Sequence, residues 1–431
     1  MKVLVLGSGG REHAIAWRLQ RSPSVREVIV APGNPGCAQV ATCIRPPSNK
    51  PDDLLALANQ IHPDLTIVGP EAPLVDGLVD LFQTNGHLVF GPRRAAARLE
   101  GSKIFAKDFM LRHRIPTARY AIASTEDEAK KALDSFSYPI VLKADGLAAG
   151  KGVVICPDRA TALSMLHDML SGHLVGAAGR QLVVEEFLSG EEISFIGLCD
   201  GDSVLALEPS QDHKTIFEND LGPNTGGMGA YSDSRLLSAA DRELIVRTVM
   251  QPVLDGMKAE GSPFVGFLYA GLMMTADGPQ VLEFNVRLGD PESQALLHRL
   301  DCDFGALVCA AASGRQDPRL LKSRAEPSIC VVLAAHGYPG AVRTGDPISG
   351  LEDAESTGAT VFHAGTRPAK PGLQGHQEAV ETSGGRVLGV THSGPTLQQA
   401  IVNVYAACDR IHFDGMQLRR DIGRKGLKRW Q

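Results

Sequence analysis

Three polar side chains lie two residues apart in the apolar segment 280–288: Glu283, Asn285 and Arg287. Side chains alternate between the faces of an extended strand, so this spacing predicts that all three lie on one face. A carboxylate and an amide oxygen suit Mg²⁺, which usually shares its coordination shell with nucleotide phosphates. A solvated face of an edge strand is the alternative, but the intervening apolar residues indicate packing on a core. The segment therefore predicts a magnesium site for ATP phosphates, on the strand that follows a hairpin turn at 276–278.

A second segment, residues 138–156, places a glycine-rich loop between two apolar runs. Its glycines let backbone N–H groups approach an anion closely, and Lys143 on the incoming run adds a point charge. The loop is not a P-loop, because three rather than four residues separate Gly146 from Gly150, Gly152 replaces the magnesium-binding Ser or Thr, and a strand follows. An exposed lysine without a role is the alternative for Lys143. We expect a strand-loop-strand flap over phosphates.

A third glycine-rich loop, residues 7–14, follows the first apolar run. Gly9, Gly10 and Arg11 precede a helical pattern, so N–H groups at the helix start can face a phosphate. A dinucleotide fingerprint would need glycine in place of Glu12 and an acidic residue after the second run, where the sequence has Pro and Gly. We therefore expect a small substrate with a phosphate, a purely structural turn being the alternative. The loop at 69–74 ends another run at the same sheet edge, where a proline-rich turn is the alternative.

The pattern of apolar runs predicts the elements that carry these loops. Up to about residue 100, apolar runs alternate with helical patterns, which is typical of a parallel sheet with crossover helices. From residue 103 the runs are longer, with hairpins and a helical stretch over 239–260, and a polar stretch at 313–327 indicates a boundary. The predicted fold is α/β and α+β multidomain: an N-terminal parallel-sheet domain (1–102), a central domain (103–315) and a small C-terminal α+β domain (325–431).

Composition excludes several classes of function. The 431 residues carry 43 Lys and Arg against 49 Asp and Glu, a net charge of -6, and 5% aromatic residues, which argues against nucleic-acid and membrane partners. The sequence has no apolar run that would span a bilayer and no apolar signal region at its start. Its eight cysteines show neither a C-x-x-C pair nor zinc spacing. Free thiols and a cytoplasmic location are expected.

In order along the chain, these loops and several others resemble the glycinamide ribonucleotide synthetases, also called phosphoribosylamine-glycine ligases. Each loop is a weak signal alone, whereas the ordered series is specific and spans nearly the whole chain. The resemblance implies an ATP-grasp fold with a flap subdomain at about 117–190. It also implies that ATP, glycine and 5-phosphoribosylamine give glycinamide ribonucleotide, ADP and phosphate in de novo purine biosynthesis. The matching motifs lie at residues 7–14, 31–34, 69–74, 99–103, 143–152, 222–231 and 287–292.

The implied chemistry needs no covalent nucleophile on the protein. A glycine carboxylate is a poor electrophile, so ATP would convert it to an acyl phosphate that the amine of phosphoribosylamine then attacks. The protein would position the reactants and neutralise charge. The resemblance implies Mg²⁺ (or Mn²⁺) on Glu283 and Asn285, and Arg287 near the charge of the transferred phosphoryl group. Asp212 and Lys214 would lie near glycine and the reacting centre.

The resemblance also implies two sets of binding residues. The backbone of residues 186–188 would face adenine, and Glu192 would bind the ribose hydroxyls, with Glu191 as a near-equal alternative. The nucleotide set is Lys103, Lys143, Gly150, Gly152, Glu185, Glu186, Leu188 and Glu192. The set for glycine and phosphoribosylamine is Gly9, Gly10, Arg11, Gly33, Asn34, Glu71, Asn224, Gly226, Asp290 and Pro291.

The chain departs from the family pattern at a few positions. Thr215 stands where Arg usually follows the Asp-His-Lys motif, which puts a phosphate role there in doubt, and Leu418 replaces a frequent aromatic. The tail with Arg424, Lys425, Lys428 and Arg429 is expected to be a solvated basic end. Loops 337–340 and 384–389 match the last domain of the family, and their contact with ligand stays open.

Other classes fit less well. Another ATP-grasp ligase or carboxylase would share Glu283, Asn285 and Arg287 but use a different acceptor, and the N-terminal loop and the motif at 290–292 argue against it. An ATP-binding regulatory protein without turnover would be expected to lose a metal ligand or a lysine, and both kinds are present. The family suggests a monomer or a weak homodimer.

Overall fold

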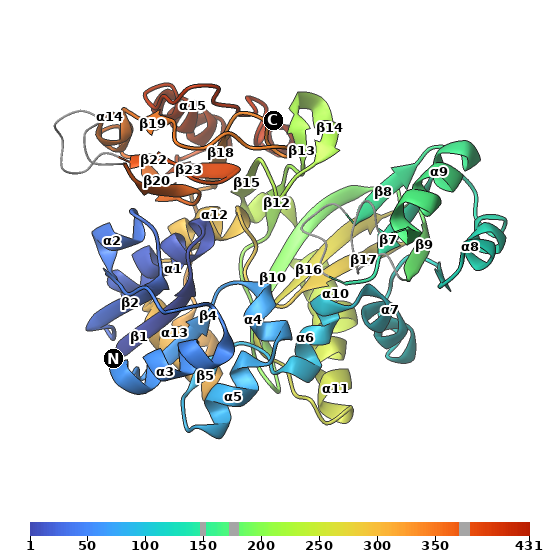
Figure 1. Ribbon diagram of the computed structural model, residues 1–431, viewed down its shortest axis with the longest axis horizontal. Helices are drawn as coiled ribbons and strands as arrows, with labels where there is room; N and C mark the ends of the chain where they lie inside the picture. Colours follow the sequence, from blue (N-terminus) through green and yellow to red (C-terminus); the bar gives the residue numbers. More distant parts are fainter. Residues whose placement is uncertain (147–151, 172–180, 370–379) are drawn as a thin grey trace.

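The N-terminal part of the chain forms a five-stranded sheet in the order β3-β2-β1-β4-β5 (Figure 1). The computed structural model describes residues 1–146, 152–171, 181–369 and 380–431. Every neighbouring pair in this sheet is parallel, and residues 3–6 of its central strand are buried. The predicted parallel sheet is confirmed. Its strands are β1 (Lys2–Gly7), β2 (Glu27–Pro32), β3 (Thr42–Cys43), β4 (Leu65–Val68) and β5 (Val89–Phe90), and its helices α1 (Gly10–Gln20), α2 (Cys37–Val40), α3 (Pro51–Ile61), α4 (Glu71–Val75), α5 (Leu78–Thr84) and α6 (Arg94–Gly101).

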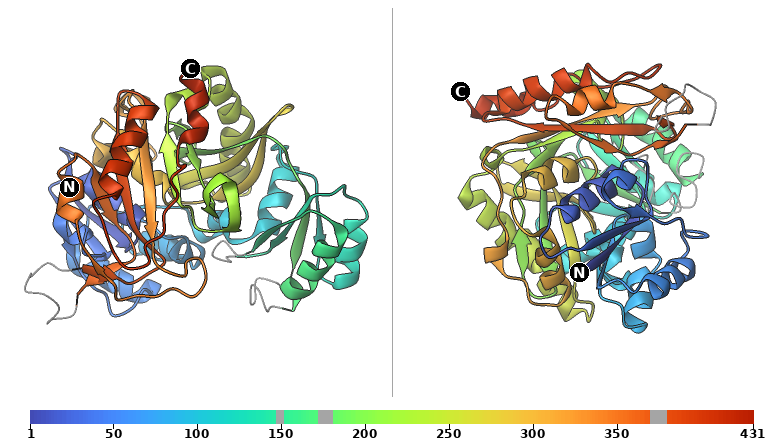
Figure 2. Two further views of the ribbon diagram at one scale, coloured as in Figure 1. Left: turned by 90° about the horizontal axis from the view of Figure 1, so that it is seen from above. Right: turned by 90° about the vertical axis from the view of Figure 1, so that its left-hand side faces the viewer.

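The predicted flap is a small antiparallel sheet that projects to one side of the molecule (Figure 2). Its strand order is β6-β9-β7-β8, and two helices complete a hydrophobic core of its own. Helix α7 (Lys103–Arg112) leads into it. The elements are β6 (Tyr120–Ala123), α8 (Glu126–Leu133), β7 (Ile140–Ala144), β8 (Val153–Cys156), α9 (Arg159–Leu170) and β9 (Leu182–Glu186).

A nine-stranded sheet forms the centre of the molecule in the order β17-β16-β10-β12-β15-β18-β23-β20, with β11 paired to β10. The sheet contains strands from both sides of the predicted boundary at 313–327, because β15 before it pairs antiparallel with β18 after it. The C-terminal part therefore extends the central sheet. The strands are β10 (Glu191–Asp200), β11 (Val204–Ala206), β12 (Ser210–Asp212), β15 (Gly229–Ser232), β16 (Val265–Thr275), β17 (Gly278–Asn285), β18 (Ser328–Ala334), β20 (Thr360–His363) and β23 (Arg386–Ser393).

Smaller elements complete the central and C-terminal parts. A two-stranded ribbon, β13 (Thr215–Phe217) and β14 (Leu221–Asn224), stands beside the C-terminal part (Figure 1). A three-stranded sheet has the order β19-β22-β21. The remaining strands and the longer helices are β19 (Pro347–Ile348), β21 (Thr366–Pro368), β22 (Val380–Thr382), α12 (Glu292–Arg299), α13 (Phe304–Ala312), α14 (Leu351–Glu355) and α15 (Leu397–Cys408).

The predicted helix over 239–260 is present, but its centre is irregular. It consists of α10 (Ala239–Ile245), a π-helical segment (Val246–Met250) and α11 (Gln251–Ala259). Pro252 has no N–H to donate to the carbonyl four residues earlier, which explains why the regular hydrogen-bond pattern changes just before it.

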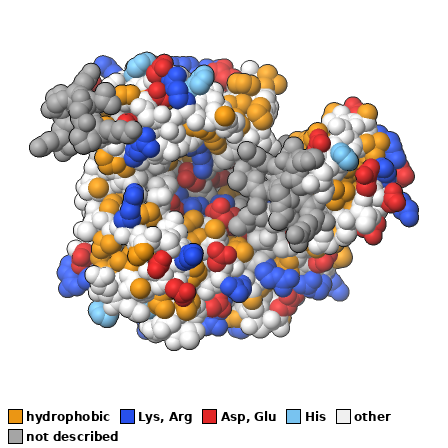
Figure 3. Space-filling view, in the orientation of Figure 1, with side chains coloured by type: hydrophobic (Ala, Val, Ile, Leu, Met, Phe, Trp, Pro, Cys, Tyr) orange, Lys and Arg blue, Asp and Glu red, His pale blue; other side chains and the backbone are white. Residues whose placement is uncertain are grey.

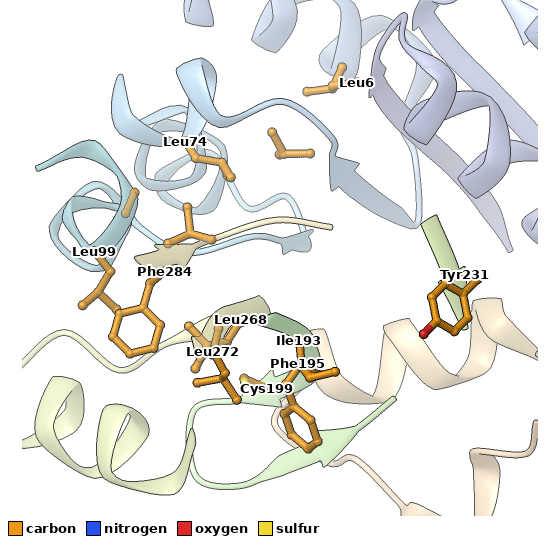
Figure 4. Close-up of a cluster of buried hydrophobic side chains, with 14 of the residues drawn as sticks. Leu6, Leu74, Leu99, Ile193, Phe195, Cys199, Tyr231, Leu268, Leu272 and Phe284 are labelled. Carbon is orange, nitrogen blue, oxygen red and sulfur yellow. The ribbon is translucent and has the colours of Figure 1, made fainter. Parts of the chain in front are cut away.

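One hydrophobic core joins the three parts of the chain. Leu6 of β1, Leu99 of α6, Phe284 of β17 and Tyr231 of β15 belong to the same cluster of buried side chains (Figure 4). Apolar residues of β18, β23 and α15 belong to it as well. Because the parts share this core, loops from all three can be held in fixed positions around one site.

The C-terminal tail packs on the rest of the protein, but Arg424, Lys425 and Lys428 are exposed, so the predicted solvated basic end is right for these three residues and wrong for Arg429. Residues Arg424–Arg429 form a short 3₁₀ helix, and Arg429 Nη2 lies 2.6 Å from Glu191 Oε2. Lys428 approaches the same carboxylate at 3.3 Å, and Lys425 pairs with Asp220. Carboxylates distant in sequence attract these cations, and nothing in the tail itself reveals them.

All eight cysteines are free, as predicted. Within the described ranges, the helices are too short or too polar for a membrane crossing.

Candidate active site

The strand predicted to bind metal has the expected hairpin and side-chain arrangement. Strands β16 and β17 pair antiparallel across the turn, with a bulge at Leu282 that precedes Glu283. Lys214 Nζ lies 3.6 Å from Glu283 Oε1. Burial alone would raise the pKa of Glu283, but Lys214, then Lys103 and Lys143, lower it to about 2. The carboxylate is therefore ionised at neutral pH, as a magnesium ligand must be.

Lys214 lies between two carboxylates that come from different strands. It pairs with Glu192 of β10 as well as with Glu283 of β17. Burial alone would lower the pKa of Lys214, but these carboxylates raise it well above its ordinary value. Asp212, on β12, differs: burial and the nearby Glu292 raise the pKa of its carboxyl well above the usual range. The site thus holds a fixed cation and a carboxyl group that can exchange a proton.

Arg287 connects the metal strand to the N-terminal part of the chain. Its Nη2 donates to Glu100 Oε1 at 2.7 Å and to Asn285 Oδ1 at 3.1 Å, and its Nε donates to Glu71 Oε2 at 3.2 Å. Burial would lower the pKa of this guanidinium, but Glu100 and Glu71 raise it. The three residues predicted to share a face, Glu283, Asn285 and Arg287, therefore do meet at one site. Glu100 is a partner that the sequence reasoning missed.

The side chain of Glu12 occupies the space in which neighbouring glycines would otherwise carry a Cβ. Its Oε2 accepts from the backbone N–H of Gly9 at 2.6 Å, and its Oε1 accepts from Arg11 Nε at 2.6 Å. A Cβ at Gly7 or Gly69 would approach Glu12 side-chain atoms to 2.5 Å or 2.1 Å, too close for any other residue. The buried carboxylate takes the space that a third glycine leaves open in a dinucleotide site, and it packs against Gly69 at the start of the loop 69–74.

Asp290 lies against the same loop. Gln294 Nε2 donates to its Oδ1 at 2.8 Å, and a Cβ at Gly9 or Gly10 would lie 3.5 Å or 3.7 Å from its carboxylate oxygens. Burial would raise the pKa of Asp290, but Arg386, Arg11 and Gln294 lower it. The predicted substrate residues Gly9, Gly10 and Asp290 are thus brought together.

Asn34 and Gly33 hold the loop after β2. Asn34 Nδ2 donates to the carbonyls of Ser8 at 2.9 Å and His363 at 2.7 Å, and its Oδ1 accepts from the N–H of Cys37. Gly33 has a φ of +71°, and a Cβ there would lie 2.5 Å from Cys43 Sγ. Hydrogen bonds within the protein thus use both polar atoms of the Asn34 amide and join this loop to residues 8 and 363.

The loop before β15 closes the site from the side of the C-terminal part. The N–H of Gly226 donates to Tyr338 Oη at 2.9 Å, and Arg386 donates to the carbonyls of Gly226 and Asp290. A Cβ at Gly227 would lie 2.5 Å from Pro291 and 2.8 Å from Asp212 Oδ1. Loops 337–340 and 384–389 thus reach the site through these contacts, whereas Asn224 is exposed on the ribbon.

The flap lysine, Lys143, lies beside the strand that carries Glu283. Lys143 Nζ lies 2.9 Å from Glu185 Oε2 and donates to the carbonyl of Leu282, beside Glu283, at 2.8 Å. Lys103 donates to the carbonyl of Gly146 at 3.3 Å. Gly152 is buried, and its carbonyl accepts from Ala144. Gly150 lies outside the described residues.

The segment 185–192 contains several residues predicted to bind the nucleotide, and their side chains contact different parts of the protein. Glu186 binds Arg119, with its Oε2 2.8 Å from Nε, and the following residues 187–190 link β9 to β10. Glu191 faces the C-terminal tail and Gln211, whereas Glu192 faces Lys214. Of the two candidates for ribose, only Glu192 lies on the side of Lys214 and Glu283. Leu188, between the two sheets, is only partly buried.

Figure 3 shows a hollow in this face of the molecule, with acidic and basic side chains gathered in it. Two antiparallel sheets, β6-β9-β7-β8 and the one that carries β17, meet at the site. Lys143 of the first sheet donates to the carbonyl of Leu282 in the second, beside Glu283. This arrangement defines an ATP-grasp protein, in which a nucleotide lies between two β-rich subdomains.

Comparisons with known proteins narrow this class. Three family models match the chain: the phosphoribosylglycinamide synthetase N domain over residues 1–100, the ATP-grasp (A) domain over 101–293 and the C domain over 328–425. The chain is 50% identical over 439 residues to the phosphoribosylamine–glycine ligase of Allochromatium vinosum, with 100% of this chain and 99% of that protein covered. It is 47% identical over 434 residues to that of Escherichia coli K12, with both fully covered.

Comparison with solved structures gives the same family. The crystal structure of phosphoribosylamine–glycine ligase from Thermotoga maritima matches with a TM-score of 0.85 at 33% identity, covering 98% of this chain and 100% of that one. A biotin carboxylase from Campylobacter jejuni matches with a TM-score of 0.71 at 15% identity over 99% and 95% of the chains, which shows a shared fold alone. The chain belongs to the phosphoribosylglycinamide synthetase family, and the expected ATP-grasp fold is confirmed.

Proposed function

We propose that this chain joins glycine to 5-phosphoribosylamine, using ATP, and releases glycinamide ribonucleotide, ADP and phosphate, a step of purine biosynthesis. The observation that carries the proposal is that the ionised Glu283, Lys214 and Lys143 converge near the glycine-rich loop 7–14, against which Asp290 packs. The first three form a phosphate and metal site, and the last two form the edge at which a phosphosugar amine would bind. Two relatives named phosphoribosylamine–glycine ligase match the chain from end to end.

The donor set fits a hard divalent cation. Glu283 offers an ionised carboxylate and Asn285 an amide oxygen, and the described residues hold no group of three or more Asp, Glu, His or Cys side chains that would form a closed metal site. Mg²⁺ typically binds one or two protein oxygens together with substrate phosphates. Glu283 and Asn285 would hold Mg²⁺ or Mn²⁺, which when bound neutralises phosphate charge.

The reaction would proceed in two displacements. A carboxylate oxygen of glycine attacks the γ-phosphorus of ATP, so that the bond from this phosphorus to the bridging oxygen breaks, and glycyl phosphate and ADP form. The amine nitrogen of phosphoribosylamine then attacks the acyl carbon, phosphate leaves, and the nitrogen loses a proton. In this scheme Lys143 and Lys103 hold phosphates, and Lys214 and Arg287 stabilise the charge on the transferred group.

The remaining residues take part in binding and proton transfer. The raised pKa of Asp212 suits it to accept the proton that the amine releases. Glu192 would bind ribose, and the backbone of residues 186–188 would face adenine. Gly9, Gly10, Arg11, Glu71 and Asp290 would surround phosphoribosylamine, and Gly226 with Pro291 would border glycine. The free thiols support the expectation of a cytoplasmic location.

Transfer of an isotope tests this proposal. Glycine labelled with ¹⁸O in its carboxylate should give inorganic phosphate that carries one ¹⁸O atom per turnover when ATP and phosphoribosylamine are present. The label moves because the glycine oxygen that attacks ATP leaves with the phosphoryl group. Phosphate without label would rule out glycyl phosphate. Unlabelled phosphate and no glycinamide ribonucleotide would instead favour a ligase with another acceptor.

A further inference from the structure

A buried cluster behind the phosphate site contains a lysine that has no role in the reaction described above. Lys107, on α7, is 2% exposed. Its Nζ lies 3.1 Å from Glu185 Oε2 and donates to Thr117 Oγ1 at 2.7 Å. Glu185 is 1% exposed and also pairs with Lys143 at 2.9 Å, through the same oxygen. Two lysines therefore share one oxygen of a single buried carboxylate.

The charges of this cluster do not balance. Two ammonium groups face one carboxylate, and among the described residues Glu185 Oε1 has no hydrogen-bond partner. Two further carboxylates act on these lysines: Glu186 raises the pKa of Lys107, and Lys143 lowers the pKa of Glu283. Burying charge is costly unless it is paired, so sharing Glu185 leaves each lysine only partly neutralised. An anionic ligand close to Lys143 would add to its neutralisation.

The two lysines differ in how they reach the metal strand. Lys143 donates directly to the carbonyl of Leu282, and its charge is one of those that lower the pKa of Glu283. Lys107 donates to Thr117 Oγ1, which in turn donates to the carbonyl of Val281 at 2.7 Å, and Lys107 is not among the groups that lower the pKa of Glu283. Lys143 is thus the lysine that an anion at Glu283 would meet.

We propose that Lys107 is a positioning residue for nucleotide binding: it neutralises Glu185, so that the positive charge of Lys143 remains available to the phosphates of ATP. This inference rests on the proposed function, in which Lys143 binds phosphate. Without Lys107, Glu185 would pair with Lys143 alone and offset its charge.

Three variants separate this role from simple packing. Lys107→Met keeps the length and apolar stem but removes the charge. Lys107→Arg keeps the charge. In the double variant Lys107→Met with Glu185→Gln, both charges are gone, and Lys143 again has an unbalanced positive charge. A packing role predicts that the double variant is at least as impaired as Lys107→Met, whereas a charge role predicts recovery.

Steady-state kinetics and calorimetric binding of Mg-ADP provide the readouts. For Lys107→Met we expect KM for Mg-ATP and Kd for Mg-ADP to rise about tenfold, as for the loss of a buried charge-assisted interaction. KM for glycine and for phosphoribosylamine should change less than about twofold, because neither ligand faces Lys143 in this scheme. Lys107→Arg should resemble the wild type, and the double variant should bind Mg-ADP more tightly than Lys107→Met. Thermal unfolding checks that each variant is folded.

The pH dependence gives a second readout that needs only the wild type and Lys107→Arg. Burial lowers the pKa of Lys107 to about 8, with Glu185 opposing and Lys143 adding to the shift. Glu186 on β9 and the ring of Tyr120 on β6, whose hydroxyl donates to Asp108, are the other groups that face it. Kd for Mg-ADP should therefore rise above about pH 8 in the wild type and stay flat in Lys107→Arg, because an arginine remains charged.

The outcomes separate the two proposals. An unchanged nucleotide affinity in a folded Lys107→Met, or no recovery in the double variant, would overturn the role of Lys107 while the ligase assignment stands. Equal pH profiles for the wild type and Lys107→Arg would also overturn it, even if Lys107→Met does not fold. A wild-type protein that binds no Mg-ADP would instead contradict the proposed function itself.

Discussion

Replacing Glu283 by Gln tests the metal and phosphate site with minimal change of shape. The variant keeps one oxygen but loses the negative charge that faces Lys214 at 3.6 Å. Lys214 keeps its other partner, Glu192, and the metal strand keeps its backbone pairing with β16. The fold should therefore be nearly unaffected, with a change in the free energy of unfolding below about 1 kcal/mol, as for a partly exposed ion pair.

The effect on catalysis should be much larger. Glu283 is ionised, with a pKa of about 2, and is the one carboxylate of the proposed metal site. An amide is a weaker ligand for Mg²⁺ and leaves more of the phosphate charge unneutralised in the transition state. Losing this neutralisation of charge raises the activation free energy by several kcal/mol. We expect kcat/KM for Mg-ATP to fall by about 10³, which corresponds to roughly 4 kcal/mol.

The assay is ADP release at saturating glycine and phosphoribosylamine, with Mg²⁺ and ATP varied independently. The apparent affinity for Mg²⁺ should fall together with kcat. Glu243→Gln, at an exposed position on α10, is the matched control and should behave as the wild type. A Glu283→Gln variant with normal kcat and normal dependence on Mg²⁺ would refute the metal assignment.

Three further predictions concern other parts of the molecule. Gly9→Val places a Cβ 2.9 Å from Glu12 Oε2, so KM for phosphoribosylamine should rise at least tenfold with KM for ATP within twofold; an unchanged KM for the amine, in steady-state assays, would discard the phosphate-loop hypothesis. Glu192→Gln should raise KM for ATP about tenfold while Glu191→Gln lowers only the unfolding temperature, and the reverse pattern would exchange their roles. Burial and a neighbouring histidine lower the pKa of His13 to about 3, so the unfolded state binds the proton first and the free energy of unfolding should fall as the pH drops below about 6.5. Urea titrations at several pH values check this, and a slope unchanged in His13→Gln would contradict it.

Short-range patterns were sufficient for the N-terminal parallel sheet and for the hairpin that carries Glu283. The alternation that predicted one face for Glu283 and Asn285 depends only on strand geometry, and the turn at 276–278 follows from local composition. The crossover pattern of the first hundred residues likewise predicted a parallel sheet. The family resemblance supplied the ATP-grasp class, which spacing alone did not give.

The sequence did not reveal which distant residues form ion pairs or hydrogen bonds with the site residues. Arg287 is bound by Glu100, and Glu100 lies in a helix whose sequence gives no sign of a buried charge. Arg386 reaches Asp290 from another part of the chain. Such contacts depend on how the parts of the chain pack, because burial and charge pairing are set by tertiary structure.

The basic tail is a second case in which contacts distant in sequence could not be predicted. A charged segment is usually solvated, and that expectation missed the ion pairs that Arg429 and Lys425 form with Glu191 and Asp220. The docking of the tail also answers a question that the sequence left open. Since Glu191 is engaged by Arg429, the neighbouring Glu192 is the better candidate for the ribose.

The ligation of glycine to phosphoribosylamine with ATP can be measured directly. Purified protein is given Mg-ATP with and without glycine and freshly generated phosphoribosylamine, and ADP release is followed together with mass spectrometry of the products. ADP should form only when both substrates are present, in equal amount to glycinamide ribonucleotide. No ADP with both substrates, or ADP formed equally well without phosphoribosylamine, would contradict this reaction.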